Sequence, residues 1–136
     1  MIKKSQASVL VVEDSLAAAK RLQFCLQRAG FTVEIAKDGE QALEMARQKP
    51  FDVVVTDEQM PVMTGRQLCQ HLRNDDQYAR TPIIFLTANL SAMDADELKD
   101  DLRISVTLGK PFSPELLVRA VEAELATKRT AENVAD

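Results

Sequence analysis

The chain has 136 residues, enough for one domain that buries its own hydrophobic core. Hydrophobic residues make up 46% and charged residues 28%, which is ordinary globular usage and argues against a disordered chain. Seventeen basic and twenty-one acidic residues leave a net charge of −4, which argues against direct nucleic-acid binding and against a polybasic membrane anchor.

Five short apolar runs rich in Val and Ile recur along the chain, and each is followed by a stretch with helical spacing. The runs predict strands at residues 8–12, 32–36, 52–56, 82–86 and 104–108. The first, third and fourth runs are apolar almost throughout, which is typical of strands covered on both faces of a parallel sheet.

Helices are predicted between and after these strands, because apolar residues there repeat on one helical face. The clearest apolar faces lie at residues 22–29, 65–72 and 117–121. Capping signals mark helix starts at residues 38–41, 64–67, 91–94 and 113–115. Gly30 stands where a helix C-cap is needed.

Strand and helix alternate five times, with no internal repeat and no interior linker. This order predicts an α/β fold, in which a five-stranded parallel sheet carries helices on both faces. We expect the domain to cover residues 1–127. Residues 128–136 are polar without periodicity, so we expect a frayed tail or the remnant of a linker there.

Several classes of site are excluded by the glycines, the cysteines and the length of the apolar runs. The four glycines form neither a dinucleotide-binding nor a P-loop motif. The longest apolar runs are far too short to cross a bilayer, so we expect no membrane insertion. Cys25 and Cys69 have no metal or redox spacing and fall in apolar helical patterns, which indicates buried, reduced thiols in a cytoplasmic protein.

Charged and polar residues follow four of the predicted strands. Glu13 and Asp14 come after the first strand, Asp57 after the third, Thr87 after the fourth and Lys110 after the fifth. Ligands of open α/β sheets bind at the carboxyl ends of the strands, so we expect these residues to share one site. Each residue taken alone is explained equally well as a helix cap, a turn or a connection. The prediction of a shared site rests on their occurring together at the ends of four strands.

The chemistry of such a cluster points to a divalent cation and a phosphoryl group. Two carboxylates about 4 Å apart repel by about 4 kcal/mol at an intermediate dielectric, and a cation relieves that repulsion. Mg²⁺ suits a site with one or two carboxylates, several waters and phosphate oxygens. A carboxylate facing a phosphoryl donor can act as nucleophile, while a hydroxyl and an ammonium stabilise the charge of the transferred group.

The motifs around these residues resemble those of a known family. They read Val-Val-Glu13-Asp14-Ser, Val-Thr-Asp57-Glu-Gln-Met-Pro, Ile-Ile-Phe-Leu-Thr87-Ala and Gly-Lys110-Pro-Phe. The chain is similar to the receiver domains of two-component response regulators, including the chemotaxis regulators, from about residue 8 to residue 126. The resemblance implies the flavodoxin-like receiver fold, a doubly wound sheet with strand order 2-1-3-4-5.

The resemblance also implies a metal site and a phosphorylation site. Asp57 would accept a phosphoryl group from a histidine kinase or a histidine phosphotransfer protein. Asp14 and Asp57 would bind Mg²⁺ directly with the backbone carbonyl of Gln59, and Glu13 would act through a water molecule. The domain would be a signalling switch, not an enzyme of metabolism, and would catalyse only its own phosphoryl transfer and dephosphorylation.

Further residues would surround the phosphoryl group. Thr87 and Lys110 would contact it, and Ala88 would leave room for it. The peptide bond between Lys110 and Pro111 would be cis. Asn89, like Gln59, occupies a position that tends to set how fast water removes the phosphoryl group.

The chain departs from the family pattern at Thr107. Three residues before Lys110 the family usually has Tyr or Phe, whose inward movement accompanies the shift of the threonine. The phosphoryl chemistry should survive, since the residues at the strand ends are unchanged. Two interpretations of the output stay open, a modified signalling face or the use of another surface such as the first helix. The downstream effector is not identified, and both a monomer and a phosphorylation-dependent dimer are compatible with the sequence.

Other functions fit less well. A receiver-like interaction module that works without phosphorylation is favoured only by Thr107. An aspartyl-phosphate phosphatase needs a second acid two residues after the nucleophile, where this chain has Gln59. A flavin-binding protein would need a loop rich in Ser, Thr or Gly after the first strand, where Glu13 and Asp14 would repel a phosphate. Met60 and Met63 are expected to pack under the loop after Asp57.

Overall fold

The computed structural model describes residues 7–89 and 101–134, and residues 128–134 by their backbone alone. One sheet of five parallel strands has the order β2-β1-β3-β4-β5. Its strands are β1 (Ser8–Val12), β2 (Thr32–Ala36), β3 (Val53–Asp57), β4 (Ile83–Thr87) and β5 (Val106–Gly109). This arrangement confirms the predicted α/β fold and the strand order 2-1-3-4-5.

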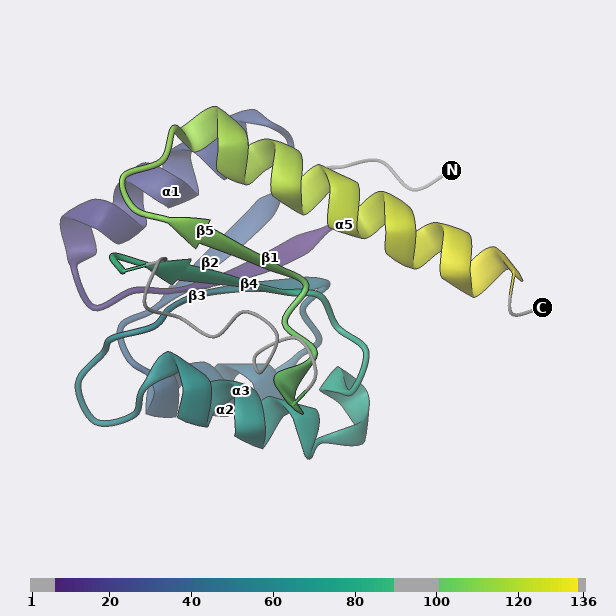
Figure 1. The fold of residues 1–136 in the computed structure, drawn as a ribbon, viewed down its shortest axis with the longest axis horizontal. Coiled ribbons are helices and arrows are strands. Elements are labelled where there is room, and N and C mark those ends of the chain that lie inside the picture. The colour runs from purple at the N-terminus through teal and green to yellow at the C-terminus, as the bar shows by residue number, and fades with distance from the viewer. Residues whose placement is uncertain (1–6, 90–100, 135–136) are drawn as a thin grey trace.

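Helices cover both faces of the sheet (Figure 1). In the described part of the chain they are α1 (Leu16–Arg28), α2 (Gly39–Gln48), α3 (Gly65–Arg73), the short 3₁₀ helix η2 (Asp76–Tyr78) and α5 (Pro114–Val134). Helices α1 and α5 lie side by side on one face, and α2 and α3 on the other. The helix start expected at residues 91–94 lies outside the described residues. None of the described helices is long and apolar enough to cross a membrane.

Three strand boundaries differ from the sequence prediction. β3 extends to Asp57, which pairs with Leu86 of β4. β4 starts one residue later than expected, because Pro82 has no N–H to donate to a ladder. β5 starts at Val106, two residues late, after a left-handed backbone conformation at Arg103 (φ 52°). Asp57 therefore stands at the last position of a fully buried strand, where the pairing of β3 and β4 fixes its backbone.

The end of α5 also differs from the prediction. The helix continues to Val134, so residues 128–134 are helical, where a frayed tail or the remnant of a linker was expected. Residues 128–134 include no Gly or Pro to end the helix. The proposed domain boundary at residue 127 is not tested by this observation.

The core lies on both sides of the sheet and is divided by it. Successive residues of a strand point to opposite faces, so Leu10 and Val12 pack with α2 and α3, while Val9 and Val11 pack with α1 and α5. All four side chains have no exposed surface. β1 is thus covered on both faces at the centre of the sheet, and the residues directly after it start from a rigid position.

The two cysteines are not equally buried. Cys69 belongs to the core beneath the sheet, and burial raises the pKa of its thiol to about 12. Cys25 is only partly buried, because it faces the side of α1 that borders α5 rather than the sheet. The prediction of a buried thiol is correct for Cys69 and wrong for Cys25. Neither cysteine forms a disulfide.

Arg73, at the end of α3, forms hydrogen bonds with the segment that leads into β5. Its Nε donates to the carbonyl of Leu102 at 2.8 Å, and its Nη2 donates to that of Arg103 at 2.9 Å. Its Nη1 donates to the carbonyls of Tyr78 at 2.6 Å and Thr81 at 2.8 Å. A guanidinium can serve four acceptors in these directions, whereas an ammonium offers only three donors at one point.

We expect Arg73→Lys to lower the free energy of unfolding by about 2 kcal/mol, because at least one buried carbonyl loses its donor. Urea denaturation measures the difference. Arg47→Lys, on the exposed surface of α2, is the matched control and should leave stability unchanged. Equal stability of the Arg73 variant and the wild type would show that these hydrogen bonds contribute little.

Candidate phosphoryl and metal site

Three carboxylates converge at the carboxyl end of the sheet. Glu13 and Asp14 directly follow β1, and Asp57 ends β3, the strand beside it. One carboxylate oxygen from each residue lies within 4.8 Å of the others. Glu13 is 4% exposed and Asp57 8%, whereas Asp14 is exposed to solvent. The structure thus brings together the three acids that the sequence analysis selected.

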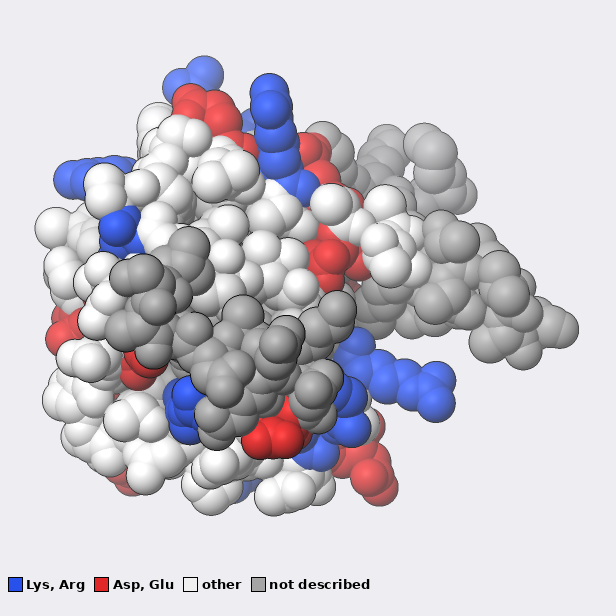
Figure 2. All heavy atoms as spheres, in the orientation of Figure 1, with Lys and Arg blue, Asp and Glu red and all other residues white. Residues whose placement is uncertain are grey.

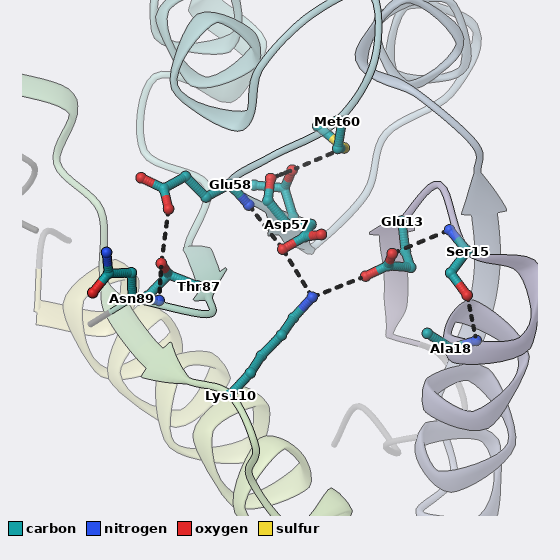
Figure 3. A network of polar contacts seen from close by, with 10 residues as sticks. Glu13, Ser15, Ala18, Asp57, Glu58, Met60, Thr87, Asn89 and Lys110 are labelled. Carbon is teal, nitrogen blue, oxygen red and sulfur yellow. Dashed lines mark hydrogen bonds and ion pairs between the residues drawn. The ribbon is translucent and has the colours of Figure 1, made fainter. Parts of the chain in front are cut away.

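Lys110 reaches this cluster from the loop after β5 (Figure 3). Its Nζ lies 3.0 Å from Asp57 Oδ1 and 3.4 Å from Glu13 Oε2. Burial alone would lower the pKa of the Lys110 ammonium, but the hydrogen bond and charge of Asp57, with those of Glu13, raise it above its usual value. Lys110 therefore stays charged and neutralises part of the cluster.

Glu13 is the acid of the cluster whose pKa is raised. Burial raises the pKa of its carboxyl group, and the negative charge of Asp57 raises it further. A hydrogen bond from the backbone N–H of Ser15 to Glu13 Oε1 (3.1 Å) and the charge of Lys110 act in the opposite direction. Ser15 also caps α1 by accepting from the N–H of Ala18, so the start of the helix holds Glu13 in place.

The loop after β3 positions the Asp57 side chain through a hydrogen bond. The backbone N–H of Glu58 donates to Asp57 Oδ1 at 3.0 Å. The N–H of Gly65 donates to the carbonyl of Glu58 at 2.8 Å, which closes the loop onto the start of α3. A Cβ at Gly65 would lie 2.2 Å from the carbonyl oxygen of Asp57, so only glycine allows this approach.

Thr87 ends β4 and is completely buried. Its hydroxyl donates to Glu58 Oε1 at 2.7 Å and accepts from the backbone N–H of Asn89 at 3.1 Å (Figure 3). Glu58 was not among the residues predicted from the sequence. An acid directly after Asp57 was visible in the sequence, but its partner belongs to another strand.

The remaining predicted residues surround this centre. Ala88 and Asn89 follow Thr87 at the surface, and Gln59 is exposed in the loop after β3. The peptide bond between Lys110 and the exposed Pro111 is cis, as predicted. The metal-binding role of the Gln59 carbonyl and the space for a phosphoryl group beside Ala88 stay predictions.

Two further expectations concern packing. Met60 and Met63 pack against the core under the loop, as predicted. Thr107 is half-buried in β5 and pairs with Phe85 of β4, so a small polar side chain occupies the position of the expected aromatic residue.

The donor set of the cluster fits a hard divalent cation. It offers carboxylate oxygens and no sulfur or imidazole ligand, which matches Mg²⁺ more closely than Zn²⁺. Lys110 supplies one positive charge to three carboxylates, which leaves the cluster with an excess of negative charge. On the coloured part of the face shown in Figure 2, Lys and Arg side chains are interspersed with Asp and Glu.

Comparison with known proteins identifies relatives over most of the chain. The family model of the response regulator receiver domain matches residues 9–122. The probable transcriptional regulator ycf29 of Porphyra purpurea is 35% identical over 116 residues, which are 85% of this chain and 54% of that protein. The chain spans about half the length of the curated relatives it matches.

Solved structures show the same fold. The chemotaxis response regulator CheY4 of Vibrio cholerae has a TM-score of 0.80 and 38% identity, covering 87% of this chain and 98% of that one. The receiver domain of the sensor histidine kinase PA1611 of Pseudomonas aeruginosa has a TM-score of 0.79 and 28% identity, covering 88% and 98%. That structure has a magnesium ion coordinated in its active site cleft.

The raised pKa of Glu13 predicts a pH-dependent stability without metal. The pKa of the Glu13 carboxyl group is higher in the folded protein than its usual value. Its contribution to folding stability is therefore fully present below the usual pKa and is lost as the pH rises through the raised pKa. In EDTA at pH 7, we expect Glu13→Gln to unfold a few degrees above the wild type, with the difference vanishing near pH 4. Thermal unfolding, followed by circular dichroism at several pH values, measures this difference in unfolding temperature. A difference that does not change with pH would contradict the stated cause.

We expect Gly65→Ala to weaken Mg²⁺ binding about tenfold, because the added Cβ must displace the backbone that carries Asp57. Calorimetric titration with MgCl₂ measures the affinity, and thermal unfolding verifies that the variant is folded. Gln70→Ala, further along α3 and exposed, is the control and should bind like the wild type. Unchanged affinity in Gly65→Ala would mean that the close approach does not position Asp57.

Proposed function

Because this chain belongs to the response regulator receiver domain family, we propose that it is a phospho-acceptor switch in which Asp57 is the phosphorylated residue. The phosphoryl donor is a histidine kinase or a histidine phosphotransfer protein. The observation that carries the proposal is the convergence of Lys110, Glu13 and Asp14 on the Asp57 carboxylate. A cationic side chain, a nucleophile and a pair of acids that can bind metal, all at one edge of the sheet, are what phosphoryl transfer to a carboxylate requires.

The metal in this proposal is Mg²⁺. Asp14 and Asp57 would bind it directly, with the backbone carbonyl of Gln59, and Glu13 would bind through a water molecule. When bound, Mg²⁺ supplies positive charge against the carboxylates and the phosphoryl oxygens. The excess negative charge of the cluster supports this assignment.

The chain's own residues perform the transfer. An oxygen of the Asp57 carboxylate attacks the phosphorus of a phosphohistidine, and the new oxygen–phosphorus bond replaces the phosphorus–nitrogen bond. The electron pair of the broken bond leaves with the imidazole nitrogen. Lys110, held 3.0 Å from Asp57 Oδ1, is placed to donate to the incoming phosphoryl oxygens. Glu58 N–H orients the carboxylate through its bond to Oδ1.

The product is an aspartyl phosphate that changes the local charge and the hydrogen bonds of Lys110 and Thr87. We propose a cytoplasmic signalling domain that catalyses only its own phosphorylation and dephosphorylation, and that acts through a protein–protein surface. Its relatives are named transcriptional regulators, and it spans about half their length. In this proposal the domain controls an effector of that kind and does not itself bind nucleic acid.

A second candidate is an interaction module of the same fold that works without phosphorylation. Thr107 favours it, because no aromatic side chain stands there to report on the site. The contacts of Lys110 with Asp57 and Glu13 favour the phospho-acceptor, since a module without phosphoryl chemistry gains nothing from a buried, mutually repelling acid pair.

Incubation with Mg²⁺ and acetyl phosphate tests the proposal. We expect one phosphoryl group per chain by intact-protein mass spectrometry, and none with EDTA or in Asp57→Ala. Asp101→Ala, an exposed acid at the far end of the sheet, is the control and should be labelled like the wild type. Labelling of Asp57→Ala would refute the site, and an unlabelled wild type would favour the second candidate.

A further inference from the structure

Glu58 is an acid beside the site that is not one of the three clustered carboxylates. Its backbone N–H donates to Asp57 Oδ1, while its side chain turns the other way and accepts from the Thr87 hydroxyl at 2.7 Å (Figure 3). Thr87 has no exposed surface, whereas Glu58 is half-buried, so the donor of this hydrogen bond is out of reach of water. Glu58 therefore links the phospho-acceptor position to the residue that would sense the phosphoryl group.

The Thr87 hydroxyl has one proton, so it can donate to only one acceptor at a time. In this structure the acceptor is Glu58 Oε1. In the proposed function the hydroxyl donates to a phosphoryl oxygen on Asp57. The two arrangements exclude each other, so engagement of the phosphoryl group by Thr87 requires loss of the bond to Glu58.

Charge acts in the same direction. A phosphoryl group on Asp57 adds negative charge to the residue directly before Glu58. Within the described ranges, the ion pairs of Lys110 go to Asp57 and Glu13, and no ion pair is formed by Glu58. Like charges that lack a shared cation repel, so the phosphorylated state also disfavours the present position of Glu58.

The Thr87 hydroxyl is connected to the loop after β4 as well. Its oxygen accepts from the backbone N–H of Asn89 at 3.1 Å. A rotation that turns the hydroxyl toward Asp57 changes the geometry of this bond. The environment of the Asn89 amide therefore reports whether Thr87 is bound to Glu58.

We propose that Glu58 is a positioning residue that competes with the phosphoryl group for the Thr87 hydroxyl and so sets how readily the domain switches. The inference rests on the proposed phosphorylation of Asp57. It assigns to Glu58 the stabilisation of the unphosphorylated position of Thr87, and removal of the carboxylate should favour the phosphorylated arrangement.

The experiment uses beryllofluoride with Mg²⁺ as a mimic of the phosphoryl group on Asp57. Glu58→Gln keeps an acceptor oxygen and removes the charge, and Glu58→Met removes both. We expect the apparent affinity for beryllofluoride to rise about tenfold in Glu58→Met and by a smaller factor in Glu58→Gln. In Glu58→Met without ligand, the Asn89 amide resonance should move toward its position in the mimic-bound wild type.

Two controls separate the hydroxyl from the charge. Glu44→Met makes the same substitution at an exposed position of α2 and should leave the affinity unchanged. In a Thr87→Ala background no hydroxyl remains to compete for, so the gain from Glu58→Met should fall to the part caused by charge. An equal gain with and without Thr87 would overturn the competition for the hydroxyl.

The outcomes distinguish this inference from the proposed function. If the wild type binds beryllofluoride and both Glu58 variants bind equally well with an unchanged Asn89 resonance, the role of Glu58 is refuted and the phospho-acceptor site stands. If the wild type does not bind the mimic although it is folded, the proposed function fails and the role of Glu58 fails with it.

Discussion

The mutual repulsion of three carboxylates at the end of β1 and β3 is the constraint on which the site depends. Glu13, Asp14 and Asp57 come within 4.8 Å of one another, and two of them are almost fully buried. Lys110 compensates only part of that charge, and burial keeps the pKa of Glu13 raised. In the proposed function a divalent cation relieves this repulsion, so the stability of the metal-free domain and its affinity for metal are linked.

The fold maintains this arrangement because the backbone is rigid at the positions from which the side chains reach the cluster. β1 and β3 are covered on both faces, so the positions directly after them are fixed by packing. The cap of α1 at Ser15 holds Glu13, and the hydrogen bond from Gly65 N–H to the carbonyl of Glu58 closes the loop that follows Asp57. Lys110 follows the edge strand β5, and its long side chain reaches both Asp57 and Glu13 from there.

The sequence predicted the parts that depend on strand ends. Strands with buried runs are recognisable by composition, and in a parallel sheet their carboxyl ends meet at one edge, which sufficed to bring together Asp57 and Lys110. The contacts of Glu58 and Arg73 could not be predicted in this way. Both depend on the direction of a side chain relative to another element, and that direction is set by tertiary packing. The partial exposure of Cys25 has the same origin, since the apolar pattern of α1 does not say how closely α5 covers it.

The most direct test of the account is a titration with MgCl₂ followed by the backbone amide resonances of the protein. The account predicts that amides at the ends of β1 and β3, those of Asp14, Ser15 and Glu58, shift together with one dissociation constant, and that the shifts are lost in Asp57→Ala. Shifts spread over the surface with different constants, or none at these three positions, would show that the acids do not form one cation site.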